Sequence, residues 1–104
     1  MAYQIFIINK NGFRKFIASL DTSSQAKLVR DIDLLQKNGP ILKMPFVKKI
    51  HKELWELRTS GKQKVRLIYS IRKNQIYILH WFIKKSQKIK PKELKLALSR
   101  LTSI

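Results

Sequence analysis

Three consecutive runs of β-forming residues between positions 54 and 85 constrain the fold more than any other feature of the sequence. They cover residues 54–59, 65–71 and 76–83. In the middle run, large apolar side chains alternate with Arg66 and Ser70, which is the pattern of a strand with two unlike faces. Gly61 interrupts the first connection, and the pair Lys73-Asn74 suits a tight hairpin because Asn tolerates positive φ. The sequence therefore predicts an antiparallel meander.

The polar positions of this meander are mostly basic, and the whole chain has a formal net charge of +17, from 23 Lys and Arg against 6 Asp and Glu. Residues 57–92 contain no acidic residue and these eleven basic ones: Arg58, Lys62, Lys64, Arg66, Arg72, Lys73, Lys84, Lys85, Lys88, Lys90 and Lys92. So large an excess indicates a polyanionic partner. We expect nucleic acid and no membrane, because no amphipathic terminal helix with a basic face stands apart from the core.

Length and composition indicate one domain. A chain of 104 residues that is 44% hydrophobic can bury one core, so we expect a single domain covering residues 1–104. Without cysteine there is neither a disulfide nor a thiolate zinc site, and the two histidines and few carboxylates argue against any metal or other cofactor. The N-terminus places an apolar run before its first charge, the reverse of a signal peptide, and no run approaches the length of a membrane span. We expect a cytoplasmic protein.

The N-terminal part of the sequence predicts one strand and two helices. Residues 3–8 are apolar β-formers, and we expect a strand buried on both faces, inside the sheet. Apolar residues at helical spacing then define two helices, with Phe13, Phe16, Ile17 and Leu20 in the first and Ala26, Val29, Ile32 and Leu35 in the second. Thr22 and Gln25 form a capping-box pattern, and Gly39-Pro40 is a stop signal. The two helices should form a hairpin packed on one face of the sheet.

The remaining segments complete an α+β domain. Residues 41–52 show no clean period, so we expect an extended connection across the surface. Pro91 suits the first position of a final helix, whose apolar side would contain Leu94, Ala97, Leu98 and Leu101. The predicted order is β-α-α-β-β-β-α, with two N-terminal helices packed on a small, mainly antiparallel four-stranded sheet and a C-terminal helix.

Arg58 and Arg66 are the residues of the meander best suited to bind phosphate. By alternation each points away from the apolar side of its strand, so in the natural register both guanidinium groups share one polar surface. There they could hold a phosphate bidentately and stay charged at any pH. We expect Arg66, in mid-strand on the polar face, to be replaceable without unfolding. The alternative for both arginines is ion pairing with Glu56 or plain solvation.

Lys84 and Lys85 point to opposite faces at the end of the last predicted strand, so at most one of them joins the arginine surface. A lysine there suits a phosphate or the charge that develops on a leaving oxygen. By alternation His80 shares a face with Ile76, Ile78 and Phe82, either as a half-buried ring or as an acid-base group. An exposed Phe82 could stack on bases, although most aromatic residues of the meander should be core. The lysines that we expect to contact RNA or the ribosome are Lys49, Lys52, Lys62, Lys64, Lys88 and Lys90.

Familiar catalytic patterns are absent from the sequence, which has no Gly-rich phosphate loop, nucleophile elbow or paired carboxylates. An enzyme of this composition must work with Arg, Lys and His. Those groups suit cleavage of RNA, where the substrate supplies its own 2′-hydroxyl nucleophile and the protein aligns it and neutralises charge.

The sequence resembles the RelE/ParE superfamily of toxins from type II toxin-antitoxin systems, and most of all its HigB-type, phage-derived branch. The motifs that carry the resemblance are LWELR at 54–58, VRLIY at 65–69, LHWFIKKSQKIKP at 79–91 and KELKLALSR at 92–100. It implies a RelE-like fold and a ribosome-dependent, metal-independent endoribonuclease that cuts mRNA in the decoding site and arrests growth. It also implies inactivation by a partner antitoxin with a helix-turn-helix domain, of the HigA-like kind. Arg58 and Arg66 match family arginines on the second and third strands, and Lys84 or Lys85 matches the basic residue after the fourth.

Two departures from the family pattern leave the general base open. RelE has lysines on the second strand where this chain has Leu54 and Glu56, and it has a C-terminal tyrosine without an equivalent here. The candidates for the base are Lys49, His51, Lys52 and His80. The alternatives to a nuclease are a ParE-like gyrase inhibitor and a non-catalytic basic RNA-binding module.

Overall fold

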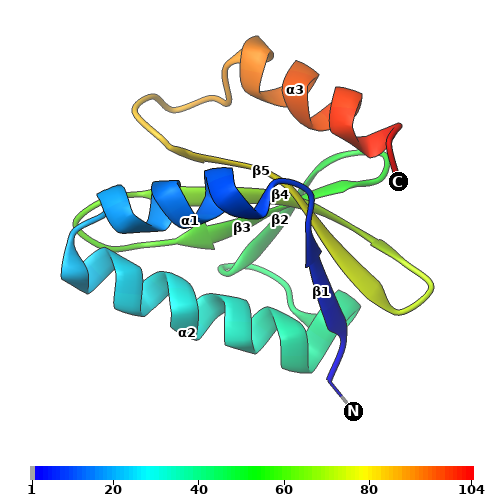
Figure 1. Ribbon diagram of the computed structural model, residues 1–104, viewed down its shortest axis with the longest axis horizontal. Helices are drawn as coiled ribbons and strands as arrows, with labels where there is room; N and C mark the ends of the chain where they lie inside the picture. The colour runs from blue at the N-terminus through cyan, green and yellow to red at the C-terminus, as the bar shows by residue number, and fades with distance from the viewer. Residues whose placement is uncertain (1) are drawn as a thin grey trace.

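The computed structural model describes residues 2–104 and has an α+β fold, as predicted. Within these residues, five strands form one mixed sheet in the order β1-β5-β4-β3-β2 (Figure 1). The strands are β1 (Gln4–Ile7), β2 (Val47–His51), β3 (Leu54–Thr59), β4 (Val65–Arg72) and β5 (Gln75–Ile83). The helices are α1 (Lys10–Ser19), α2 (Thr22–Asn38) and α3 (Pro91–Leu101), and a 3-10 turn, η1 (Gly39–Ile41), follows α2. In the same residues, no helix combines the length and apolar composition that crossing a membrane requires.

The predicted meander is confirmed. β3 pairs with β4 and β4 with β5, both antiparallel. Arg72 lies opposite Gln75, so Lys73 and Asn74 form a two-residue turn between them. Both turn residues have positive φ, 50° and 65°, which matches the right-handed twist of the paired strands.

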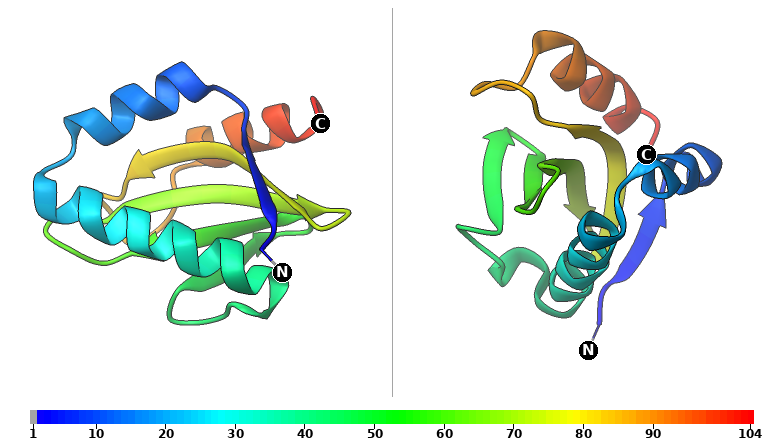
Figure 2. Two further views of the ribbon diagram at one scale, coloured as in Figure 1. Left: turned by 60° about the horizontal axis from the view of Figure 1, so that its bottom comes forward. Right: turned by 90° about the vertical axis from the view of Figure 1, so that its left-hand side faces the viewer.

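Helices cover both faces of the sheet. α1 and α2 lie on one face, where the larger core forms, and α3 lies on the other (Figure 2). The predicted helix hairpin on one face is therefore confirmed. The larger core contains Phe13, Leu20, Leu28, Leu35, Val47, Leu57, Val65, Leu67, Tyr69, Ile76 and Ile78. The smaller core, under α3, contains Leu54, Ile68, Leu79, Ala97 and Leu101.

The first strand is at an edge of the sheet, so the prediction of a doubly buried inner strand is wrong. β1 pairs only on one side, in parallel with β5. Ile5 and Ile7 pack against the larger core, whereas Phe6 remains 42% exposed and stacks on Tyr77 at 5.4 Å. This aromatic contact explains how an apolar run can occupy an edge. Tyr3 fixes the position, because its N–H donates to the carbonyl of Gln36 near the end of α2 (2.9 Å).

A fifth strand, β2, lies in the segment that the sequence predicts to be an extended connection. It pairs antiparallel with β3 and forms the second edge of the sheet. The register shifts between Lys49 and His51, and this irregularity interrupts the alternation by which a strand is recognised. Exposed Lys48 and Lys49 are typical of an edge strand that must not pair with another chain. The sheet thus has five strands, not four.

The buried face of α2 matches the predicted face only in part, because Leu35 is buried and Ile32 packs against the larger core. Leu28 and Asp31 are buried, whereas Ala26 is exposed and Val29 is 60% exposed. Apolar residues occur on several sides of this helix, so their spacing alone does not select one stripe. The N-cap is Asp21 and not Thr22 of the predicted capping box, because the Asp21 carboxylate accepts the N–H of Ser24 at 2.7 Å.

A bulge in β5 changes the face on which His80 lies. Ile68 is opposite His80 while Tyr69 is opposite Ile78, so Leu79 is an additional residue. His80 therefore does not share a face with Ile76 and Ile78, which belong to the larger core, although it does share one with Phe82. The predicted alternation is wrong at this point, and His80 lies on the α3 face.

Candidate functional site

A basic cleft of about 660 Å³ lies at the end of the meander where β5 leaves the sheet. Arg58 and Arg66 contribute from β3 and β4, Lys62 and Lys64 from the connection between them, and Lys84 and Lys85 from the segment after β5. The structure thus brings together four of the five predicted catalytic residues and two of the predicted RNA-binding lysines. We call this the cationic cleft. Its remaining lining residues are Gln63, Ile83, Ser86 and Gln87.

Lys84 lies at the centre of the cationic surface. Its N–H donates to the carbonyl of Lys64 (2.8 Å), which extends the pairing of β4 and β5 beyond Ile83. The side chain is half-buried and lines the cleft and two smaller cavities that share residues with it. Burial lowers its pKa from the usual lysine value; Glu56 opposes this effect, and nearby Arg66 and other cations add to it.

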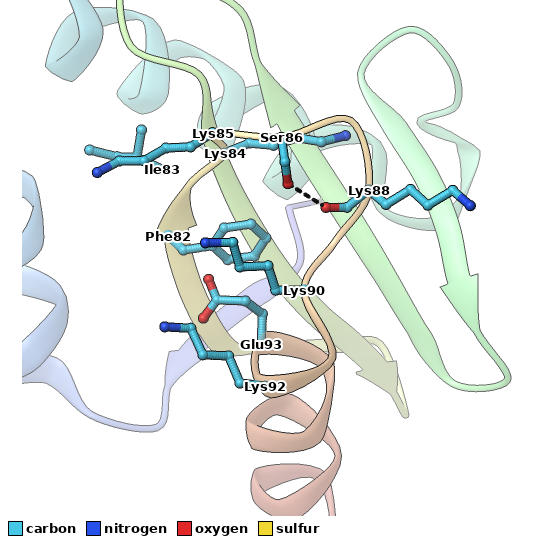
Figure 3. A pocket seen from close by; sticks show the side chains of 9 residues that line it. All are labelled: Phe82, Ile83, Lys84, Lys85, Ser86, Lys88, Lys90, Lys92 and Glu93. Atoms are coloured by element: carbon cyan, nitrogen blue, oxygen red, sulfur yellow. Dashed lines mark hydrogen bonds between the residues drawn. The ribbon is translucent and has the colours of Figure 1, made fainter.

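Lys85 is exposed, and its side chain extends in the direction opposite to that of Lys84 (Figure 3). Both lysines line the cleft, and the charges of Arg58, Arg66 and Glu56 act on Lys84. The opposite directions of the two side chains agree with the prediction, although both residues line the cleft that contains the arginines.

The two arginines face each other across neighbouring strands. Arg58 of β3 is directly opposite Arg66 of β4, and Arg66 is directly opposite Phe82 of β5. These three side chains form one row on the α3 face of the sheet. The predicted common surface for the two guanidinium groups is confirmed.

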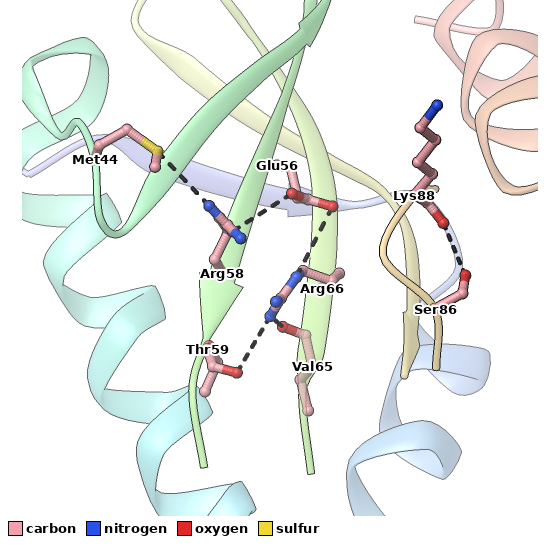
Figure 4. A network of polar contacts seen from close by, with 8 residues as sticks. All are labelled: Met44, Glu56, Arg58, Thr59, Val65, Arg66, Ser86 and Lys88. Atoms are coloured by element: carbon pink, nitrogen blue, oxygen red, sulfur yellow. Dashed lines mark hydrogen bonds and ion pairs between the residues drawn. The ribbon is translucent and has the colours of Figure 1, made fainter. Parts of the chain in front are cut away.

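A buried carboxylate lies between the arginines. Glu56 is 1% exposed, and its oxygens are 3.8 Å from Nε of Arg58 and 4.0 Å from Nε of Arg66 (Figure 4). The ion-pairing alternative for the arginines is therefore present in the structure. Within residues 2–104, neither Oε2 of Glu56 nor Nε of Arg66 has a hydrogen-bond partner. The two groups are therefore within ion-pair distance but do not form a hydrogen bond through these atoms.

Arg66 is buried, contrary to the expectation of a replaceable surface position. It is 4% exposed, and its Nη1 donates to the carbonyls of Val65 (3.0 Å) and Thr59 (3.4 Å). Its place between Arg58 and Phe82 in the cross-strand row explains the shielding. Burial lowers the pKa of Arg66, Glu56 opposes the shift, and Arg58 adds to it. Arg58, with 28% of its side chain exposed, is the more accessible arginine.

His80 belongs to a separate network beneath α3. It is 7% exposed, its Nε2 is 3.0 Å from Oε1 of Glu93, and its Nδ1 is 3.5 Å from Nη1 of Arg100. The same Nη1 donates to the carbonyl of Leu79 at 2.7 Å, and the guanidinium lies over the Trp81 ring. The network joins β5 to α3, and His80 does not line the cationic cleft.

The other predicted residues occupy different surroundings. Lys49 lies over the ring of Trp55 at 5.7 Å, on the face opposite the arginines, and Lys52 is exposed in the turn after β2. His51 is exposed at the end of β2. Lys88 and Lys90 are exposed and line a smaller cavity next to the cleft. Across the described part of the chain, no three His, Cys, Asp or Glu side chains are grouped as a metal site would need.

Lys48 is a further cation of this surface, and it is not among the residues predicted from the sequence. It lies opposite Glu56 and contributes to the lowered pKa of Lys84. The signal was the strand character of residues 47–51, because alternation along a strand paired with β3 places Lys48 on the arginine face.

Comparison with known proteins identifies the family. A search of curated proteins finds no significant match to this chain. The model of the family described as "Phage derived protein Gp49-like (DUF891)" matches residues 15–102, which include the meander, the cationic cleft and all of α3. The chain therefore belongs to the Gp49-like family of phage-derived proteins, a family of RelE/toxin-like proteins.

Proposed function

We propose that this protein is the toxin of a type II toxin-antitoxin system and that it is a metal-independent, ribosome-dependent endoribonuclease, which cuts mRNA and thereby inhibits translation and growth. The observation that carries the proposal is the convergence of Arg58, Arg66 and Lys84 on one cleft with a buried carboxylate between the arginines. Membership of a family of RelE/toxin-like proteins supports it.

The cleft suits cleavage of RNA by its own 2′-hydroxyl. In this reaction the 2′-hydroxyl loses its proton to a base and its oxygen attacks the adjacent phosphorus. The bond to the 5′-oxygen breaks, that oxygen takes a proton from water, and a 2′,3′-cyclic phosphate and a 5′-hydroxyl form. Arg58 is accessible and permanently charged, so it can stabilise the charge that develops on the phosphate. We assign Lys84 the role of general base, because it is half-buried among other cations and its lowered pKa increases the fraction of neutral amine. Lys84 thus replaces Lys49, His51, Lys52 and His80 as our candidate.

Arg66 and Glu56 would act as supports for these two residues. Arg66 is fixed by two backbone carbonyls and lies beneath the cleft. Glu56 is near both arginines, so it limits the directions in which their guanidinium groups can point. A phosphate that enters the cleft would meet cations that are already in position, which is the condition for electrostatic catalysis.

The proposed partners follow from charge and family. The exposed lysines around the cleft, Lys62, Lys64, Lys85, Lys88 and Lys90, form a surface complementary to ribosomal RNA and mRNA. A HigA-like antitoxin with a helix-turn-helix domain would hold the toxin inactive. The protein would then act in the cytoplasm, where translating ribosomes are found.

Primer extension on a translated mRNA tests the proposal. Wild-type protein, Arg58→Ala, Lys84→Ala and the control Lys15→Ala, an exposed lysine of α1, are each induced in growing cells at matched levels. We expect discrete cuts within codons for wild type and control, and about 100- to 1000-fold slower cutting for the two cleft variants. DNA damage without RNA cuts would support a gyrase inhibitor instead. If neither RNA cuts nor DNA damage is found, the result would support a non-catalytic RNA-binding module.

A further inference from the structure

A second cavity of about 180 Å³ adjoins the cationic cleft, between the end of β5, the following loop and the start of α3 (Figure 3). Both cavities are lined by residues 83–86, so an elongated ligand in the cleft could continue into the second cavity. Unlike the cleft, this cavity also has an aromatic ring and a carboxylate among its lysines. We call it the side cavity.

The aromatic group of the side cavity is Phe82. Its ring is half-buried, and it stacks on His80 with 5.6 Å between centroids and 27° between planes. His80 supports one side of the ring, and the accessible part faces the cavity. Phe82 is also next to Arg66 in the cross-strand row, so it lies directly beside the place proposed for the phosphate. A ring so placed is a platform on which a nucleobase can stack.

The carboxylate of the side cavity belongs to Glu93, the one acid among the described residues that line it. Oε1 of Glu93 is 3.0 Å from Nε2 of His80, a buried ring that also contacts Arg100. This contact fixes the direction of the carboxylate and leaves Oε2 to accept from a ligand. Figure 3 shows the Glu93 carboxylate next to the Phe82 ring.

The charge around Glu93 narrows the class of ligand. Lys88, Lys90 and Lys92 line the same cavity, so a ligand must carry negative charge as well as a donor for the carboxylate. A nucleotide whose base has an exocyclic amino group meets both requirements, because its phosphate faces the lysines and its amino group donates to Glu93. Uracil fits poorly, since its ring N–H is flanked by carbonyl oxygens that the carboxylate would repel.

We propose that the side cavity binds the base of the nucleotide next to the phosphate held in the cationic cleft, and that it selects adenine, guanine or cytosine over uracil. The base stacks on Phe82 and donates its exocyclic amino group to Glu93. The position of this nucleotide relative to a cut rests on the proposed function, whereas the preference among bases does not.

Binding of single nucleotides tests the selection without any cleavage. The purified protein is titrated with AMP, GMP, CMP and UMP at one low salt concentration, and binding is followed by chemical-shift changes. We expect the three amino-bearing nucleotides to bind roughly tenfold more tightly than UMP, the lower part of the range for a specific base contact. Equal affinity for all four nucleotides would overturn the proposal.

Matched variants separate the two contacts. Glu93→Gln keeps an oxygen for His80 and should reduce the preference over UMP to about twofold or less. Phe82→Leu should weaken the binding of all four nucleotides by a similar factor, with no change in the order of their affinities. The controls are Glu53→Gln, an exposed acid, and Phe6→Leu, an exposed aromatic, both outside the cavity. A Glu93→Gln protein that still discriminates against UMP contradicts the assignment, even if Phe82→Leu does not fold.

The base profile of cuts in translated mRNA provides the second readout. Uracil should be depleted at one position next to the cut for wild type, and Glu93→Gln should remove that depletion. If the wild-type protein cuts no RNA, the proposed function fails, while the nucleotide titration still shows whether the side cavity selects among bases. If it cuts RNA without any depletion of uracil and UMP binds as well as the others, the side cavity is not a base site.

Discussion

Replacing Arg66 by alanine should destabilise the whole fold, in addition to any effect on activity. The substitution removes a buried guanidinium, its two bonds to backbone carbonyls and one of the two salt-bridge partners that Glu56 has among residues 2–104. Glu56 is then a 1% exposed carboxylate whose remaining salt-bridge partner among residues 2–104 is Arg58, at 3.8 Å. A buried charge with fewer partners destabilises the folded state, because water cannot reach it to replace the lost interactions.

The size of the effect follows from the burial of both partners. Removing one partner of a buried ion pair typically costs about 3 to 5 kcal/mol. We expect the lower end, about 3 kcal/mol, since Arg58 stays close to Glu56. For a domain of roughly 100 residues this corresponds to a decrease in Tm of about 12 to 24 °C. The variant should still fold at 25 °C if the parent has a typical stability of about 5 to 15 kcal/mol.

Thermal unfolding followed by circular dichroism measures the change. The control is Arg14→Ala, an exposed arginine of α1, which should shift stability by no more than about 0.5 kcal/mol. In a Glu56→Gln background the carboxylate charge is absent, so Arg66→Ala should cost at least about 1 kcal/mol less. An Arg66→Ala protein that melts with the parent, or an equal loss in both backgrounds, would show that Glu56 and Arg66 are not coupled.

Three further predictions concern other parts of the molecule. Leu28→Ala should cost about 2 to 5 kcal/mol of unfolding free energy, whereas the neighbouring Val29→Ala should change it by about 0.5 kcal/mol or less; similar losses would refute the assigned face of α2. The N–H of Ser24 lowers the pKa of Asp21, so the stability that Asp21 adds is present above its unfolded pKa and is lost as pH falls through the folded value. The Tm difference between wild type and Asp21→Ala should thus vanish in acid, and a pH-independent difference would argue against the cap. Reversing the charge of Lys88 and Lys90, both exposed, should weaken ribosome binding and reduce its salt dependence without lowering Tm; unchanged binding would place the contact surface elsewhere.

The meander and the common surface of the two arginines could be predicted because their signals are local. Strict alternation in β4 separated the apolar residues from Arg66, and the turn at Lys73-Asn74 fixed the register with β5. Pairing of β3 with β4 then placed Arg58 opposite Arg66. Each step depends on neighbours within a few residues, so one sequence is sufficient for it.

Other features depend on contacts between distant segments. The bulge at Leu79 moves His80 to the α3 face, and nothing in an apolar run marks such an additional residue. β2 can be recognised as a strand only from its pairing with β3, because its own alternation of side chains is interrupted after Lys49. The burial of Arg66 likewise results from its place between two neighbours in the sheet, and a sequence pattern shows only that the residue is polar.

Cleavage of a defined mRNA on reconstituted ribosomes tests the central claim most directly. Purified wild-type protein, Lys84→Ala and the control Lys15→Ala are added to ribosomes that hold one mRNA, and the positions and chemistry of the new ends are mapped. We predict one main cut in the decoding site that leaves a 2′,3′-cyclic phosphate, at equal rates for wild type and control. Lys84→Ala, without the proposed base, should cut about 100- to 1000-fold more slowly. An intact mRNA with the wild-type protein, or equal cutting by Lys84→Ala, would contradict the account.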